Sequence, residues 1–326
     1  MEDKKKNSLK SVSVGLAILA FLLSMALIIE SIFILTSGSV AFPFNDIAPV
    51  PSNKVAVIYV EGTIVTDNIP SGYGYASSND VIKSLRQAQN DKSIKAIVLR
   101  INSPGGTPVA AEEIHSQIEK TRAVKPVVVS MGDMATSAAY FISAPCNKIV
   151  ANPDTFTGSI GVIWVFENRT AYYGKEGVEY YVAKTGPYKD VGADWRGLSD
   201  SEKTYVNDII NESYSRFVDV VSEGRNIPRE DVVKIADGRV FTGQKAKQMG
   251  LVDEMGGMYD AIDIAAKLGN ISGTPDVTYM NEPSLYSLLF GSESSTNAPE
   301  TYSGLRLSPA LEYKGPYQSP YGRLIM

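Results

Sequence analysis

The stretch Val127-Val-Val-Ser-Met-Gly-Asp-Met-Ala-Thr-Ser137-Ala-Ala-Tyr140 starts as an apolar, β-branched run and ends in a helical pattern. The run over residues 127–130 predicts a strand, and residues 136–144 predict a helix. A serine at such a junction has an exposed hydroxyl, and the next backbone N–H is aimed at a developing oxyanion. Ser137 is therefore a candidate nucleophile.

The same alternation continues on both sides of this junction. Further strands are predicted over residues 55–60, 96–101, 148–151 and 160–165, and further helices over residues 78–89 and 108–122. Alternating strands and helices favour right-handed crossovers and a parallel sheet, so we expect an α/β fold. Ser199 and Glu202 have the spacing of a capping box, and shorter helices are expected near Arg229, Gly243 and Met258.

The composition excludes several classes of function. The chain has 326 residues, 44% of them hydrophobic, and 31 basic against 36 acidic residues give a net charge of -5. Without a basic stripe, nucleic acid is not an expected partner. The lone Cys146 is expected to be a small core residue. One histidine and one cysteine cannot form a zinc cluster, so no metal and no cofactor is predicted.

The amino terminus predicts a membrane anchor. Residues 12–36 are almost continuously apolar and long enough to span a bilayer as a helix. Lysines precede this run, and no basic residue follows it until Lys54, so residues 1–11 are expected in the cytoplasm and the rest of the chain outside it. The alternative is a cleaved signal peptide, since Ser39-Val-Ala41 has the small residues of a processing site. We expect a linker over residues 37–53, a folded domain over 54–282 and a flexible tail over 283–326.

A base for Ser137 has to be found in a chain with one histidine. The pKa of a lysine amine in water is about 10.4, so a lysine base must be neutralised by burial. Lys189 and Lys184 are both candidates, and their spacing from Ser137 does not choose between them. His115 is the rival base of a serine triad, although its glutamate neighbours favour an exposed helical face.

A glycine pair gives a second motif. Arg100-Ile-Asn-Ser-Pro-Gly-Gly-Thr-Pro108 follows a predicted strand and opens a helix. Paired glycines let the backbone approach a ligand with its N–H groups, as an oxyanion hole requires, but an isolated Gly-Gly is more often only a tight turn.

Five ordered motifs together resemble the signal peptide peptidase A family. They are Asn102-Ser-Pro-Gly-Gly106, Ser130-Met-Gly-Asp-Met-Ala-Thr-Ser137-Ala-Ala-Tyr140, Thr157-Gly-Ser-Ile-Gly-Val162, Lys184-Thr-Gly-Pro-Tyr-Lys189-Asp190 and Ala236-Asp-Gly-Arg-Val-Phe-Thr-Gly243. The resemblance implies a ClpP/crotonase-like spiral of ββα units and a peptidase that uses a Ser/Lys dyad. Two departures are Ala138-Ala139, where relatives often have Gly-Gly, and Asp133, where a small residue is common.

The resemblance also implies roles for single residues. Ser137 would be the nucleophile and Lys189 the general base, with the amides of Gly106 and Ala138 holding the oxyanion. Ser159 matches the position whose hydroxyl orients the lysine, and a turn serine is an equally good reading. The implied substrates are signal-peptide fragments and other hydrophobic peptides in the membrane, cleaved by a homo-oligomer whose neighbouring subunits share active sites. A catalytically silent scaffold and an acyl-CoA-binding crotonase-type enzyme are the alternative functions.

Overall fold

The structure, a computed structural model, describes residues 21–25, 27–28, 53–67, 74–281 and 323–325. The chain divides into two units, Met1–Val50 and Pro51–Met326. In the first unit, the described residues Phe21–Met25, Leu27 and Ile28 are helical and exposed. Within the described ranges, no helix has both the length and the apolar character needed to cross a membrane. Most of the expected anchor and linker, residues 12–36 and 37–53, lies outside the described residues, as do residues 1–11 and most of the expected tail over 283–326.

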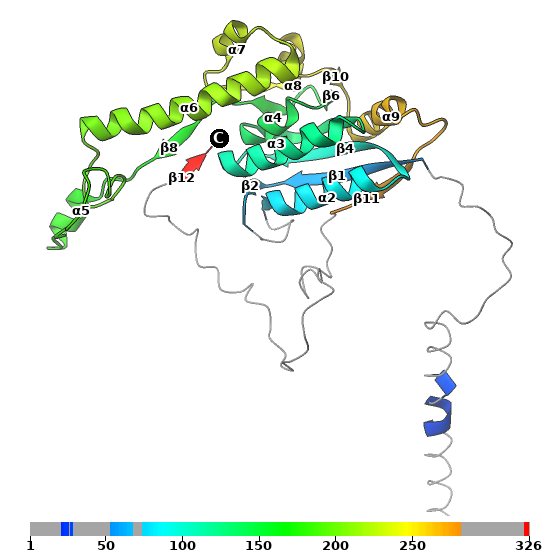
Figure 1. Cartoon of the computed structure of the whole chain (residues 1–326), viewed down its shortest axis with the longest axis horizontal. Coiled ribbons are helices and arrows are strands. Elements are labelled where there is room, and N and C mark those ends of the chain that lie inside the picture. The colour runs from blue at the N-terminus through cyan, green and yellow to red at the C-terminus, as the bar shows by residue number, and fades with distance from the viewer. Residues whose placement is uncertain (1–20, 26, 29–52, 68–73, 282–322, 326) are drawn as a thin grey trace, which may run out of the picture. The chain divides into compact units, whose positions relative to one another are not determined.

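In the second unit, eight strands of the described chain form one sheet (Figure 1). Its central order is β10-β6-β5-β4-β1-β11, with β7 beside β5 and β9 beside β7. The strands are β1 Lys54–Glu61, β4 Ile94–Ser103, β5 Val127–Thr136, β6 Lys148–Ala151, β7 Phe156–Gly158, β9 Val240–Thr242, β10 Glu254–Met255 and β11 Asp276–Tyr279. All neighbours are parallel except β7 and β9. The predicted α/β fold with a mostly parallel sheet is confirmed.

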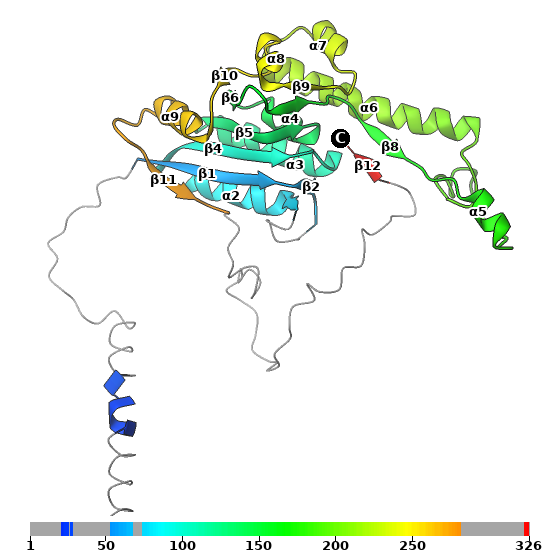
Figure 2. The same ribbon diagram turned by 180° about the vertical axis from the view of Figure 1, so that it is seen from behind.

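Helices cover both faces of this sheet because its strands alternate their side chains between two cores. In β4, Ile97, Leu99 and Ile101 join the larger core, whereas Ala96 and Val98 join the smaller one. The larger core is packed by α2 Ser78–Asn90, α3 Pro108–Arg122, α4 Ala138–Ser143, α6 Asp200–Arg225, α7 Arg229–Ile235 and α8 Gly243–Gln248. The smaller core is closed by α9 Met258–Leu268 on the opposite face (Figure 2).

Local signals set several helix ends as the sequence predicts. Helix α3 has Pro108 in its first turn, where a missing N–H costs no hydrogen bond. Helix α6 begins with the expected capping box, since the Ser199 hydroxyl accepts from the Glu202 amide and the Glu202 carboxylate accepts from the Ser199 amide. Strand β5 is longer than predicted because its second half pairs with β4 and β7.

Short strands were less predictable. Strand β7 was missed, and the strand expected over residues 160–165 is only β8 Ile163–Val165. Strand β8 pairs antiparallel with β12 Arg323–Ile325, and β2 Thr63–Val65 pairs with β3 Tyr75–Ser77. After β8, residues 166–199, here called the arm, contain α5 Thr170–Lys175 and lead to the start of α6. The remainder of the described unit is called the body. Both views show α5 projecting away from the sheet (Figures 1 and 2).

Candidate active site

Ser137 lies at the turn between β5 and α4, as the sequence predicts. Its backbone has φ 57° and ψ −124°, and its amide donates to the Gly158 carbonyl at 2.8 Å. Among the described non-glycine residues, positive φ also occurs at Ser159, Asn226 and Asn270. Asn226, with ψ 43°, is in the left-handed region that asparagine adopts readily, whereas the ψ of −124° puts Ser137 outside that region. The backbone of Ser137 is therefore strained, and such strain concentrates at functional sites. The strained turn leaves Ser137 half-buried and at the edge of a cavity.

This cavity of about 520 Å³ brings Ser137 and Ser159 together. Side chains from β8 and α6 make much of its wall apolar. Its lining residues are Pro104, Ser137, Ser159, Gly161, Val162, Ile163, Ile210, Asn211, Tyr214, Ala236, Asp237 and Gly238. Concave, mainly apolar pockets with a few polar groups are typical of ligand sites. Ile163 also belongs to β8, whose edge pairs with the C-terminal strand β12, so a strand of this chain lies beside the cavity.

The two proposed oxyanion donors flank the same turn. Ala138 opens α4, and the first N–H groups of a helix have no acceptor within the helix. The loop before Gly106 approaches Ser137 from β4, because the Thr136 hydroxyl donates to the Pro104 carbonyl at 3.0 Å. Gly106 sits against Ile64: the bridge between them uses the Gly105 carbonyl and the Thr107 amide, and neither bond uses the Gly106 amide.

Gly106 has to be glycine at this position. A Cβ built there would lie 1.9 Å from the Ile64 carbonyl oxygen, far inside van der Waals contact. The Gly-Gly motif thus combines a tight turn at Gly105, with φ 110°, and a close backbone approach at Gly106.

Lys189 lies outside the cavity that contains Ser137. No lysine lines the cavity that contains Ser137. Lys189 is exposed, in the arm between α5 and α6, and its amide donates to Gly186 in a turn. The residues around Lys189 in this structure therefore do not supply the burial that a lysine base requires. Lys184 is also in the arm, and its ammonium pairs with Asp190 at 2.6 Å.

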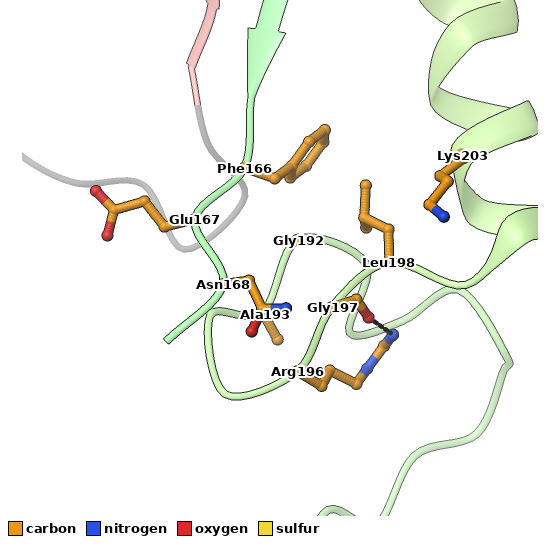
Figure 3. Close-up of a pocket in the computed structure, with 9 residues that line it drawn as sticks. All are labelled: Phe166, Glu167, Asn168, Gly192, Ala193, Arg196, Gly197, Leu198 and Lys203. Atoms are coloured by element: carbon orange, nitrogen blue, oxygen red, sulfur yellow. Dashed lines mark hydrogen bonds between the residues drawn. The ribbon is translucent and has the colours of Figure 1, made fainter. Parts of the chain in front are cut away.

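The arm is built from aromatic contacts and turns. Tyr180 stacks on Trp195 at 5.1 Å and meets Tyr173 edge-on, and the Tyr173 hydroxyl donates to Asp194. No residue of α5 is buried. A pocket of about 340 Å³ lies where the arm meets α6; it is lined by Phe166, Glu167, Asn168, Gly192, Ala193, Arg196, Gly197, Leu198 and Lys203 (Figure 3).

The other reactive side chains have structural positions. His115 is 9% exposed, so the expectation of an exposed helical face is wrong at this residue. Its ring packs against Phe141 at 5.3 Å, and burial lowers the pKa of the imidazole. Cys146 is buried as predicted, and burial raises the pKa of its thiol to about 12, which makes it a poor nucleophile. Asp133 is exposed, so its carboxylate is solvated.

Sequence reasoning missed part of the cavity wall. Ile210 and Tyr214 come from α6, a long helix that carries no catalytic motif. The loop over residues 236–238 belongs to one of the five motifs, but no sequence pattern predicts that it lies beside Ser137. In the described ranges, no group of three or more histidine, cysteine or acidic residues is placed to hold a metal ion.

Comparisons with known proteins agree with this geometry. The sequence matches the profile of peptidase family S49 over residues 119–272 and that of Clp protease over residues 60–154, consistent with a ClpP-like fold. It is 37% identical over 233 residues to a putative protease of Methanocaldococcus jannaschii, covering 69% of this chain and 74% of that protein. It is 33% identical over 235 residues to the putative signal peptide peptidase SppA of Enterococcus faecium, covering 71% of this chain and 68% of that protein.

Protease 4 of Salmonella typhi is a longer relative. It is 38% identical over 240 residues, which cover 73% of this chain but only 38% of protease 4. The similarity to relatives named as proteases extends over both β4 and the arm, and so includes both halves of the candidate site. The chain belongs to peptidase family S49.

Proposed function

We propose that this chain is a membrane-anchored serine endopeptidase that degrades remnant signal peptides and other hydrophobic peptides. Ser137 is the nucleophile, and Lys189 of a neighbouring copy is the general base. The observation that carries the proposal is the strained backbone of Ser137 at the edge of a largely apolar cavity. Such a turn exposes the hydroxyl beside the first amides of a helix.

The reaction proceeds in two halves. The neutral amine of Lys189 takes the proton of the Ser137 hydroxyl, and the oxygen attacks the scissile carbonyl. The amides of Gly106 and Ala138 stabilise the oxyanion, and the ammonium returns its proton to the departing amine. Water, deprotonated by the same lysine, then hydrolyses the acyl ester. We assign to Ser159, which lines the same cavity as Ser137, the task of accepting a hydrogen bond from the incoming amine.

Assembly of neighbouring copies is supported by what one subunit lacks. The cavity around Ser137 contains no lysine, whereas Lys189 is exposed on the arm. Several tyrosines around it are also exposed, among them Tyr181 at 97% and Tyr188 at 45%. Tyrosine is enriched in protein interfaces because it buries a large area at low entropic cost. Docking of the arm against a neighbour would bury these rings and desolvate the lysine.

The cavity and the edge of β8 support hydrophobic peptides as substrates. Val162, Ile163 and Ile210 offer apolar contacts beside Ser137. The pairing of β12 with β8 indicates that this edge accepts an extended peptide by strand addition. The apolar segment over residues 12–36 supports an anchor that holds the domain at the membrane, outside the cytoplasm.

Subunit complementation tests the nucleophile, the base and the assembly together. Ser137→Ala and Lys189→Met are purified separately as full chains and then co-assembled, and cleavage of a fluorogenic signal-peptide analogue is measured. Each single variant should lose at least about 10³-fold in kcat. Random co-assembly should restore about a quarter of wild-type activity, because a Lys189→Met subunit donates its intact serine to the lysine of a Ser137→Ala neighbour.

The outcomes separate the alternatives. Inactive single variants with no restoration would place serine and lysine in one subunit. Full activity of Ser137→Ala would reject the nucleophile. A wild-type chain without turnover would favour the silent scaffold.

A further inference from the structure

A four-residue charge cluster encloses the segment that carries Lys189. Arg196 donates to the Asp190 carboxylate through Nε at 3.1 Å and Nη2 at 2.7 Å. It also donates to the Glu202 carboxylate, through Nη1 at 2.8 Å and Nη2 at 2.6 Å. The guanidinium therefore bridges two carboxylates with paired hydrogen bonds, a geometry that its planar fork fits and that lysine cannot reproduce.

The cluster ties the arm to the fixed end of a long helix. Glu202 is 3% exposed and caps α6 by accepting from the Ser199 amide. Arg196 also donates to the backbone carbonyls of Asp190 at 3.1 Å and Gly197 at 3.1 Å, the second of which is drawn in Figure 3. The backbone next to Lys189 is thus linked through one guanidinium to a buried carboxylate at the start of α6.

Lys184 completes the cluster from the other side. Its ammonium donates to the Asp190 carboxylate at 2.6 Å and to the Pro187 carbonyl at 3.0 Å. Lys189 therefore lies between Pro187 and Asp190, both of which are held. Hydrogen bonds from Arg196 and then Lys184 keep the pKa of the Asp190 carboxyl well below its usual range. Asp190 is thus ionised and directed to these two cations.

We propose that Arg196 is a positioning residue, which fixes and charge-balances the turn carrying Lys189, and that Lys184 is a structural cation of this cluster. The inference rests on the proposed role of Lys189 as base. With two cations and two carboxylates, the cluster that holds the backbone on both sides of Lys189 is formally neutral. Lys184 already holds a carboxylate as an ammonium, and a proton acceptor has to be neutral. The two lysines of the motif are thereby assigned different tasks.

Arginine substitution at each lysine tests this division. Arginine keeps a positive charge but does not deprotonate in proteins, so it can replace a structural cation and cannot replace a base. Lys184→Arg should keep kcat/KM within about threefold, with an unchanged pH profile, and Lys189→Arg should lose at least about 10³-fold. Loss of activity in Lys184→Arg, with Lys189→Arg also inactive, would overturn the assignment of Lys184. Activity in Lys189→Arg would instead overturn the proposed function, whatever Lys184→Arg does.

Arg196→Met tests the positioning role. It should lower kcat by about 10- to 100-fold with little change in KM, because the base is misplaced. Without Arg196 the cluster has one cation against two carboxylates, and this net negative charge should move the acidic limb of the pH–rate profile to higher pH, by up to about one unit. In the double variant Arg196→Met with Asp190→Asn, the cluster is again formally neutral. The acidic limb should therefore return to its wild-type pH, while kcat stays low because the base is still misplaced. If Arg196 had only a structural role, the acidic limb would not shift in Arg196→Met and return in the double variant.

The matched control is Arg229→Met, which breaks an exposed arginine–carboxylate pair between Arg229 and Asp219 at 2.7 Å in the body. It should leave kcat and the pH profile as in the wild type. Circular dichroism and the oligomeric state of each variant are measured alongside. Wild-type kinetics in Arg196→Met would overturn the positioning role while leaving the Ser137 and Lys189 assignments intact.

Discussion

The body and the arm of this chain are stabilised in different ways. The turn that holds Ser137 is fixed by packing: every residue of α4 is buried, and β5 pairs with strands on both sides. In the arm, α5 buries nothing, and the Lys189 segment is held by ion pairs and ring contacts. The serine half of the candidate site is therefore formed by packed residues of the body. The lysine half is held in place by the contacts of the arm but is exposed. This is the arrangement expected of a surface that docks on a neighbouring copy, as we propose.

The largest effect should come from the packing beneath Ser137. Phe141 is fully buried in α4 and contacts His115 and Phe217 at ring distances of 5.3 Å. Phe141→Ala should lower the free energy of unfolding by about 3–5 kcal/mol, measured by denaturant titration. Tyr181→Ala, at a 97% exposed position in the arm, is the matched control and should change it by less than about 0.5 kcal/mol. Equal losses of unfolding free energy in the two variants would show that the body and the arm do not differ in how packing stabilises them.

The oxyanion turn should be nearly as sensitive, but in catalysis. Gly106→Ala forces its new Cβ against the Ile64 carbonyl and displaces the amide that we assign to the oxyanion. We expect kcat to fall about 10²- to 10³-fold with a much smaller change in KM. The control is Gly174→Ala in α5, where a Cβ meets no heavy atom within 4 Å. Normal kcat in Gly106→Ala would show that this amide is not a donor.

Acid should loosen the arm before the body. Hydrogen bonds from Arg196 lower the pKa of Glu202 from 4.5 to about 2. The unfolded segment therefore binds a proton more readily than the folded one, and the stability that Glu202 contributes is present above pH 4.5 and lost as the pH falls toward about 2. The chain has two tryptophans, so Trp164→Phe leaves Trp195, stacked on Tyr180 in the arm, as the only indole reporter.

In this single-tryptophan chain, fluorescence should change over that pH window, before the far-ultraviolet circular dichroism is lost. Adding Glu202→Gln should remove this pH dependence, because the replacement amide does not titrate. A fluorescence change centred above pH 6, or one that survives Glu202→Gln, would contradict the assignment.

The sequence predicts the body better than the arm, and the reason is physical. Residues 108–122 form α3 with the predicted bounds, because a proline start and a periodic apolar face are local signals. Ser137 was also predictable, since a strand-to-helix junction is local. The relation of Lys189 to Ser137 was not predictable, because no local pattern relates two residues that lie so far apart in the sequence. Arg196 bonds to Asp190 and Glu202, each six residues away across a turn, a spacing that no periodic pattern marks.

The smallest effect should follow from removal of the C-terminal strand. Strand β12 pairs with β8, whose Ile163 lines the cavity of Ser137, so the chain's own terminus and an extended substrate would use the same edge. Deletion of residues 323–326 should lower KM for a hydrophobic peptide by about three- to tenfold with kcat unchanged, because the edge is then free in every subunit. Steady-state kinetics with the full chain and the truncated chain provide the measurement. A matched substitution, Leu324→Pro, removes one backbone donor within β12 without shortening the chain and should have the same direction. If both changes leave KM unaltered, peptides reach Ser137 by a path that does not use β8. Substrate binding would then depend on the packed residues of the body around Ser137 alone.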